Sequence, residues 1–336
     1  MPVSFEVVDG QEGGFDYPSD PFDRVVEALD RALERRRRGE VGDRRYVAEL
    51  ERLVEAVPDF IDGYAHLGFA LYDQGKTKKA LDIYLRGLAV GKRLIPEGFA
   101  GHIQWAHLGN RPFLRALHGA ALGYVRLRNH RDAAGMMERL LAYNPNDNHG
   151  VRYMLGSEYL RLGETDKARA LLESECEHFP PYCYELALLR MEEGDWVKAA
   201  TALRRGFCAN PYIAEILCGN SDPAPLAVWH ETNFAEPETA KEYLSDYADR
   251  WRRRPEFVAF LRWLYNHSRV LFERAAFLAC MEELLWKQDF QRRKQILARM
   301  EKVVEEIDDR VSEAVVAKRK DRDGRSMFPW MHALTG

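Results

Sequence analysis

The stretch Asn144–Ala168, NPNDNHGVRYMLGSEYLRLGETDKA, contains the spacing that decides the fold. In it Gly163 precedes Ala168 by five residues, and Pro180 follows Ala168 by twelve. The same five-residue step recurs in three further places, one of which has arginine in the place of glycine: Gly75 to Ala80, Arg128 to Ala133, and Gly194 to Ala199. A spacing that recurs along a chain is the signature of a repeat architecture.

Each repeated unit is predicted to be two helices joined by a turn. Apolar residues fall at i, i+3, i+4 and i+7 in two segments of each unit, which is the period of an amphipathic helix. Gly75, Gly163 and Gly194 stand where the first helix must end, and glycine accepts the left-handed conformation that is common there. Proline cannot continue the helical hydrogen-bond ladder. Four prolines are therefore expected to end second helices: Pro58, Pro145, Pro180 and Pro211.

These residues resemble the tetratricopeptide repeat (TPR) family, whose unit has Leu-Gly, Tyr, Gly, Ala and Pro in this order. The two copies that match most positions carry Tyr64, Leu67, Gly68, Leu71, Gly75, Ala80, Tyr84 and Gly87, and Leu155, Gly156, Tyr159, Gly163, Ala168, Leu172 and Pro180. The resemblance implies an all-α fold, a right-handed TPR superhelix (α-solenoid) with a C-terminal helical extension. The segments NPNDNHGVRY and NPYIAEIL also resemble TPR-like proteins related to the suppressor of tumorigenicity seven family.

Five segments are expected along the chain. Residues 1–19 are predicted to be a flexible N-terminus, and residues 20–212 to hold the TPR-like repeats with an insertion near 91–110. An irregular linker over 213–235 then leads to a C-terminal helical region over 236–320 and a tail over 321–336.

The C-terminal helical region contains an apolar seam. Its residues step by three and four positions, as in a coiled coil on one long helix: Leu297, Met300, Val304, Ile307, Val311 and Ala314. The seam is shorter than three heptads, so two interpretations stay open. The helix packs over the open end of the array, or a homodimer forms through the 297–314 helix.

Composition indicates a soluble, cytoplasmic protein. The 336 residues are 46% hydrophobic and 30% charged, with a net charge of −4. No apolar run approaches the ~18 residues of a membrane span, and the N-terminus lacks the order of a signal peptide. The five cysteines do not read as a disulfide framework in a long helical chain.

Three segments contain residue types that catalysis or metal binding uses. The Asn/Asp/His cluster of NPNDNHG lacks the ligand spacing of a calcium loop, and we interpret it as a cap for the next helix. Cys176, His178 and Cys183 do not have the spacing of a zinc site. The linker segment from Trp229 to Asn233 matches no catalytic motif. An enzyme or metal protein that uses the 176–183 or 228–233 region remains the alternative function.

Three basic clusters raise a second alternative, nucleic-acid binding: Arg35–Arg38 with Arg44 and Arg45, Arg252–Arg254, and Lys318–Lys320. Acidic residues interleave with each cluster, which favours solvated helix faces. We therefore do not expect a nucleic acid as the partner. No phosphate-binding glycine loop is found.

The resemblance implies a concave groove lined by the first helix of each unit. The predicted lining is Ala65, Phe69, Tyr72 and Asp73, then Arg115, His118, Leu122 and Arg126, then Tyr153, Ser157 and Arg161, and last Tyr184, Leu188 and Met191. Ala65 and Phe69 replace the Lys and Asn of the family's carboxylate clamp, which argues against that ligand. The tyrosines and arginines favour a segment with apolar anchors and acidic groups.

We therefore predict a non-catalytic protein–protein interaction scaffold that binds a peptide or protein segment, with no cofactor and no metal. In the alternative, the C-terminal helices of the chain fill the groove themselves.

Overall fold

Left-handed turns end the first helices of the pairs, as their glycines predict. In the computed structural model, which describes residues 3–321 and 323–331, φ is +72° at Gly75, +76° at Gly163 and +79° at Gly194. Arg128 takes the same conformation at φ +57°, although it has a side chain. The five-residue step from glycine to alanine therefore marks a helix end followed by the buried alanine of the next helix, such as Ala80 or Ala168.

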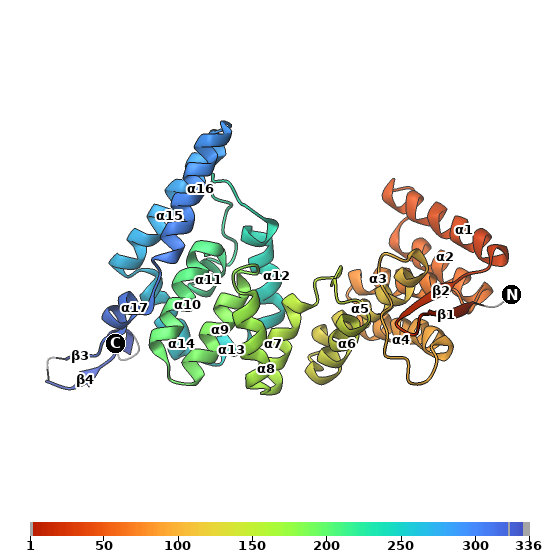
Figure 1. Ribbon diagram of the computed structural model, residues 1–336, viewed down its shortest axis with the longest axis horizontal. Coiled ribbons are helices and arrows are strands. Elements are labelled where there is room, and N and C mark those ends of the chain that lie inside the picture. The colour runs from red at the N-terminus through yellow and green to blue at the C-terminus, as the bar shows by residue number, and fades with distance from the viewer. Residues whose placement is uncertain (1–2, 322, 332–336) are drawn as a thin grey trace. The chain divides into compact units, whose positions relative to one another are not determined.

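The chain divides into two units, Met1–Gly163 and Glu164–Gly336, each with its own core. Figure 1 shows the helices and strands of both. The first unit contains β1 (Ser4–Val8), β2 (Glu12–Asp16), α1 (Ser19–Arg37), α2 (Asp43–Ala56), α3 (Ile61–Asp73), α4 (Thr77–Leu94), η1 (Leu108–Asn110), α5 (Arg111–Arg126), α6 (His130–Tyr143) and α7 (Arg152–Leu162). Successive helices of this unit pack against each other from α1 to α7, and α3 also packs on α5.

Close packing between these helices depends on small residues around one tyrosine. A Cβ atom added to Gly68 of α3 would lie 2.5 Å from Cε1 of Tyr84, and one added to Gly119 of α5 would lie 2.2 Å from the same atom. The ring of Tyr84, from α4, therefore fills the space between α3 and α5.

Residues 4–16, within the segment expected to be flexible, form a hairpin. Strands β1 and β2 pair antiparallel, with Ser4 opposite Asp16. The buried side chain of Asn110 accepts a hydrogen bond from the Phe15 amide (3.0 Å) and donates to the Gly13 carbonyl (3.0 Å). The Gly13 amide also donates to the His102 carbonyl at 2.8 Å. The insertion between α4 and α5 therefore holds the hairpin.

The second unit contains α8 (Thr165–Glu175), α9 (Pro181–Glu192), α10 (Trp196–Ala209), α11 (Pro211–Leu217), η2 (Asn233–Ala235), α12 (Pro237–Tyr247), α13 (Asp249–Arg252), α14 (Pro255–Tyr265), α15 (Ser268–Trp286), α16 (Phe290–Glu305), α17 (Asp309–Val316), β3 (Arg319–Lys320), β4 (Ser326–Met327) and η3 (Pro329–Met331). Prolines 180 and 211 precede or open helices α9 and α11. Helix α8 ends at Glu175, so Pro180 does not stop it directly, contrary to the prediction.

The predicted long helix over 297–314 is wrong. Helix α16 ends at Glu305, and the Asp308 carboxylate accepts a hydrogen bond from the Val311 amide to begin α17. Met300 and Ile307 are buried in a cluster with residues of α15. The buried members of the seam therefore serve packing within the chain, and a homodimer through 297–314 stays a prediction.

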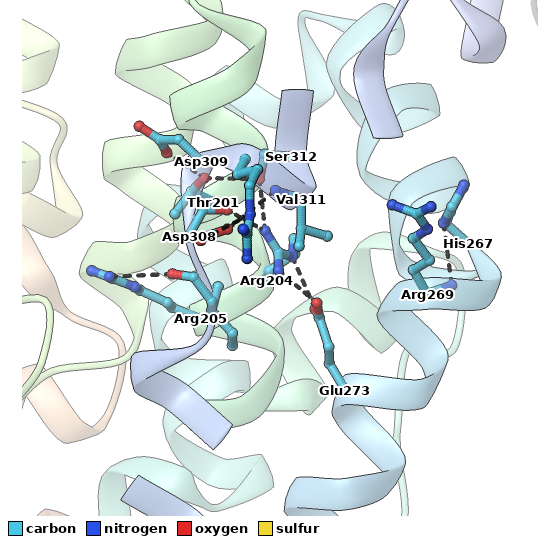
Figure 2. A network of polar contacts seen from close by, with 12 residues as sticks. Thr201, Arg204, Arg205, His267, Arg269, Glu273, Asp308, Asp309, Val311 and Ser312 are labelled. Carbon is cyan, nitrogen blue, oxygen red and sulfur yellow. Dashed lines mark hydrogen bonds and ion pairs between the residues drawn. The ribbon is translucent and has the colours of Figure 1, made fainter. Parts of the chain in front are cut away.

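Helices α10, α15 and α17 meet at a buried arginine, shown in Figure 2. The Arg204 side chain, 0% exposed, donates to both carboxylate oxygens of Glu273 at 2.9 and 2.5 Å. It also donates to the Asp308 carbonyl and to the Ser312 hydroxyl, both at 2.8 Å. One side chain therefore connects three helices.

The C-terminal segment, predicted as a tail, packs on the second unit as far as the structure describes it. The ring of Trp330 in η3 is buried 4.5 Å from that of Phe260 and 5.0 Å from that of Trp196, between centroids. Residues 322 and 332–336 lie outside the described residues. No helix among the described residues has both the length and the apolar character needed to cross a membrane.

Candidate functional site

A groove of about 880 Å³ lies within the first unit. Helices α1, α2, α3 and α5 supply its walls, and Tyr84 of α4 lies at its base. The lining residues are Asp30, Leu33, Glu34, Arg36, Arg37, Asp43, Tyr46, Ala65, His66, Phe69, Ala70, Asp73, Gln74, Tyr84, Arg115, His118, Gly119 and Leu122. Six of the predicted groove residues are among them: Ala65, Phe69, Asp73, Arg115, His118 and Leu122.

Phe69 is the main apolar feature of the groove. Its side chain is 62% exposed, while its neighbours Ala65 and Ala70 are buried. An aromatic ring this exposed on a helix face leaves apolar surface in water, which costs free energy unless another molecule covers the ring.

Arg115 is held by acidic and aromatic neighbours. Its guanidinium donates to both oxygens of Asp62 on α3, at 2.8 and 3.0 Å, and lies 5.6 Å from the centre of the Trp105 ring. The His66 ring is 3.8 Å from the same Asp62 carboxylate. Arg115 therefore joins α3 to α5 and does not present an unpaired positive charge.

Burial favours the neutral form of the histidines His66, His118 and His149. Burial, with a smaller contribution from His149, lowers the pKa of His118 to about 4. The centres of the His118 and His149 rings are 4.9 Å apart, and the His149 ring also packs edge-on against Trp105 at 4.7 Å. Burial lowers the pKa of His66 as well. The charge of the groove is therefore set by its carboxylates and arginines.

Tyr72 and Arg126, two further predicted groove residues, do not line the groove. The Arg126 guanidinium lies 3.8 Å from the centre of the Tyr72 ring and donates to the Tyr72 carbonyl at 3.4 Å. The two residues bind each other at the ends of α3 and α5.

Tyr184 was placed in the groove by the prediction, and this placement is wrong. Its side chain is fully buried, and its hydroxyl donates to the Asn210 carbonyl at 2.7 Å. Leu188 and Met191 are buried on the same helix. Most residues of helix α9 are buried, so its first-helix position does not expose these three.

The remaining predicted residues, on α7, lie outside the groove lining. Tyr153 is half-buried and Ser157 is buried, and Arg161 donates to the Ser157 carbonyl at 2.9 Å. A role for Tyr153 and Arg161 in binding stays a prediction.

The cap interpretation of NPNDNHG is confirmed. The Asp147 carboxylate accepts hydrogen bonds from the amides of Val151 and Arg152, at 2.9 and 3.0 Å, where α7 begins. Asn144 instead accepts one from the Trp105 amide at 3.1 Å, which ties this loop to the insertion.

The 176–183 region carries two thiols close to each other. The Cys183 thiol, buried, donates to the Cys176 carbonyl at 3.4 Å. Its hydrogen bond with the Cys176 thiol, together with burial, raises the pKa of Cys183 well above the ordinary thiol value. The same hydrogen bond lowers the pKa of Cys176. A thiol with a raised pKa is a poor nucleophile and metal ligand, which argues against such a role for Cys183.

The linker segment from Trp229 to Asn233 makes contacts with the surrounding helices. The Trp229 amide donates to the Met281 carbonyl at 3.1 Å, and the guanidinium of Arg293 lies 5.2 Å from the Trp229 ring centre. The His230 ring is 2.8 Å from the Tyr212 hydroxyl. Over residues 3–321 and 323–331, no three His, Cys, Asp or Glu side chains converge as a metal site would require.

The basic clusters contain several ion pairs with interleaved acids. Arg35 and Arg45 contact Glu49 at 3.1 and 3.2 Å, and Arg36 pairs with Asp43. These pairs neutralise much of the first cluster, as its sequence indicates.

Sequence reasoning missed the contribution of α1 and α2 to the groove. Asp30, Glu34, Asp43 and Tyr46 all line it. The repeat formed by α1 and α2 lacks the Leu-Gly and Gly of the family pattern. Its one recognisable feature in the sequence is Pro58, which lies in register with the prolines of the later repeats.

The paired helices, their left-handed turns and their buried alanines define an all-α protein with a TPR-like fold. No protein-family model matches the sequence, and no curated protein matches it either.

Solved structures similar to this chain include a tetratricopeptide repeat protein from Parabacteroides merdae, at 16% identity and a TM-score of 0.45, over 82% of this chain and 98% of that one. The MamA RS-1 ArsTM double mutant is similar at 14% identity and a TM-score of 0.43, over 54% and 90% of the two chains. MamA AMB-1 is similar at 19% identity and a TM-score of 0.42, over 53% and 95%. The likeness to the suppressor of tumorigenicity seven family is not among these findings.

Proposed function

We propose that this protein is a non-catalytic scaffold that binds a segment of another protein in the groove of its first unit. The observation that carries the proposal is the exposed ring of Phe69 in a groove of about 880 Å³. Exposed aromatic residues in concave surfaces are common anchors of protein interfaces.

The setting of Phe69 supports this function further. The walls of the groove are helices whose packing is fixed by Tyr84, Gly119 and the pair of Arg115 with Asp62. A site on rigid helices loses little entropy when it binds, so more of the interaction free energy appears as affinity.

The experiment compares two exposed phenylalanines. Phe69→Ser changes the groove, while Phe272→Ser changes a phenylalanine on α15 of the second unit that is 77% exposed. Both variants and the wild type carry a photo-crosslinking amino acid at Leu122, which lines the groove, and are used to capture proteins from the source cell.

We expect the wild type and Phe272→Ser to crosslink the same protein through position 122, and Phe69→Ser to lose that crosslink while keeping its helical circular dichroism spectrum. An unchanged crosslink in folded Phe69→Ser would contradict the proposal. Occupation of the groove by the chain's own C-terminal helices would instead give an intramolecular crosslink.

A further inference from the structure

The acidic residues of the groove differ from its arginines in how they are paired. Arg36 pairs with Asp43, Arg37 with Glu34, and Arg115 with Asp62. Asp30 and Asp73 both line the groove and are exposed. Within residues 3–321 and 323–331, neither of these two carboxylates has an ion pair or a side-chain hydrogen bond. The unpaired charge of the groove is therefore negative.

The two free carboxylates line the groove from different helices, Asp73 from α3, which also carries Phe69, and Asp30 from α1. Asp73 is four residues after Phe69 and so lies one turn further on the same face of the helix. Asp30 of α1 lines the same groove as His66, which is three residues before Phe69 on α3. From His66 to Asp73 the helix rises by about 10 Å.

We propose that the bound segment carries an apolar side chain that contacts Phe69, flanked by Lys or Arg side chains that reach Asp30 and Asp73. This inference rests on the proposed function and names the chemistry of the partner. The rise of about 10 Å from His66 to Asp73 equals two turns of a partner helix, so a test segment places its cationic side chains seven residues apart with the apolar one between them. This cationic partner is the opposite of the acidic partner expected from the sequence. That expectation treated the arginines of the groove as unpaired, because their acidic partners cannot be identified from the sequence alone.

The expected effect is moderate because Asp30 and Asp73 are exposed. Ion pairs between exposed side chains contribute little each and weaken as salt screens them. Removal of both carboxylates should therefore weaken binding of a cationic segment by about tenfold at most. The effect should be smaller in 500 mM than in 50 mM NaCl.

Two labelled 18-residue peptides test the inference with the full chain. Both have the same leucine positions on one helix face. One has lysine and the other glutamate at the flanking positions seven residues apart. Fluorescence anisotropy gives Kd for the wild type, for Asp30→Asn/Asp73→Asn and for Phe69→Ser. The matched control is Glu51→Gln/Asp82→Asn, which removes two exposed carboxylates of the same unit outside the groove.

We expect the lysine peptide to bind the wild type and the control about tenfold more tightly than the glutamate peptide. Asp30→Asn/Asp73→Asn should remove this preference, and Phe69→Ser should weaken both peptides. Equal binding of the two peptides, still sensitive to Phe69→Ser, would overturn the charge inference alone. Binding of neither peptide, or no effect of Phe69→Ser, would overturn the proposed function together with it.

Discussion

Replacement of Arg204 by methionine tests whether the three-helix network stabilises the second unit. Methionine keeps most of the volume but removes the charge and every hydrogen bond to Glu273, Asp308 and Ser312. Removing one partner of a buried ion pair typically costs about 3–5 kcal/mol, because the other charge remains buried. The Glu273 side chain is 20% exposed and so partly hydrated. We therefore expect a loss near the lower limit, about 3 kcal/mol.

The double variant Arg204→Met/Glu273→Leu separates the cost of the orphaned charge from the value of the pair. Apolar replacement of both partners is often close to neutral, so we expect the double variant to lose only about 1 kcal/mol, mainly from the Asp308 and Ser312 acceptors. Its loss should thus be smaller than that of the single variant.

Urea unfolding followed by tryptophan fluorescence measures both variants. Six of the seven tryptophans follow Gly163, so the signal reports chiefly on the second unit. Hydrogen exchange of α17 should become faster in Arg204→Met, since α17 then keeps the side-chain hydrogen bonds of Thr201 to α10 but loses those of Arg204. A loss below about 1 kcal/mol in the single variant, or a double variant less stable than the single one, would refute the reasoning.

Two further predictions concern the first unit. Gly119→Ala should lower the free energy of unfolding of this unit by about 1–3 kcal/mol, because the new methyl group overlaps the Tyr84 ring. The control Gly135→Ala, whose Cβ would have no atom within 4 Å, should not destabilise the unit. Equal thermal midpoints for the two variants would contradict this prediction. The pKa of His118 falls to about 4 on folding, so the unfolded chain binds more protons below its ordinary value of about 6.5 and stability should decrease as pH falls from 6.5 to 4. His118→Gln should flatten that decrease in thermal melts, and an NMR pKa of His118 near 6.5 would count against it.

The repeat architecture could be predicted because it depends on local chemistry. Gly75, Gly163 and Gly194 end helices because glycine adopts the left-handed conformation, and this cause lies within each single repeat. The break between α16 and α17 also has a sequence signal, since Asp308 is a favourable N-cap residue. The prediction of one long helix followed instead from the apolar period, which continues across the break.

The site could be predicted only in part, because its electrostatics depend on contacts between residues far apart in the sequence. The sequence gives no sign that Arg115 is paired, because its partner Asp62 lies 53 residues earlier. Tyr184 was predicted to line the groove because its position in the repeat places it on a first helix. Its burial depends on which other elements cover that helix, and the repeat pattern does not contain this information. Helix α9 is apolar around most of its circumference, which is the mark of an interior helix.

The N-terminal hairpin has a consequence for the order of folding. The helix pairs of the first unit make contacts between neighbours in sequence, which form quickly. The amide of Phe15 bonds to Asn110, 95 residues later, so the two strands have no place to dock until the insertion has been made. During synthesis the apolar side of the hairpin stays exposed to solvent while α1 to α4 emerge from the ribosome. The hairpin should thus be the last part of the first unit to become protected from hydrogen exchange, although it precedes the helices of that unit in the sequence.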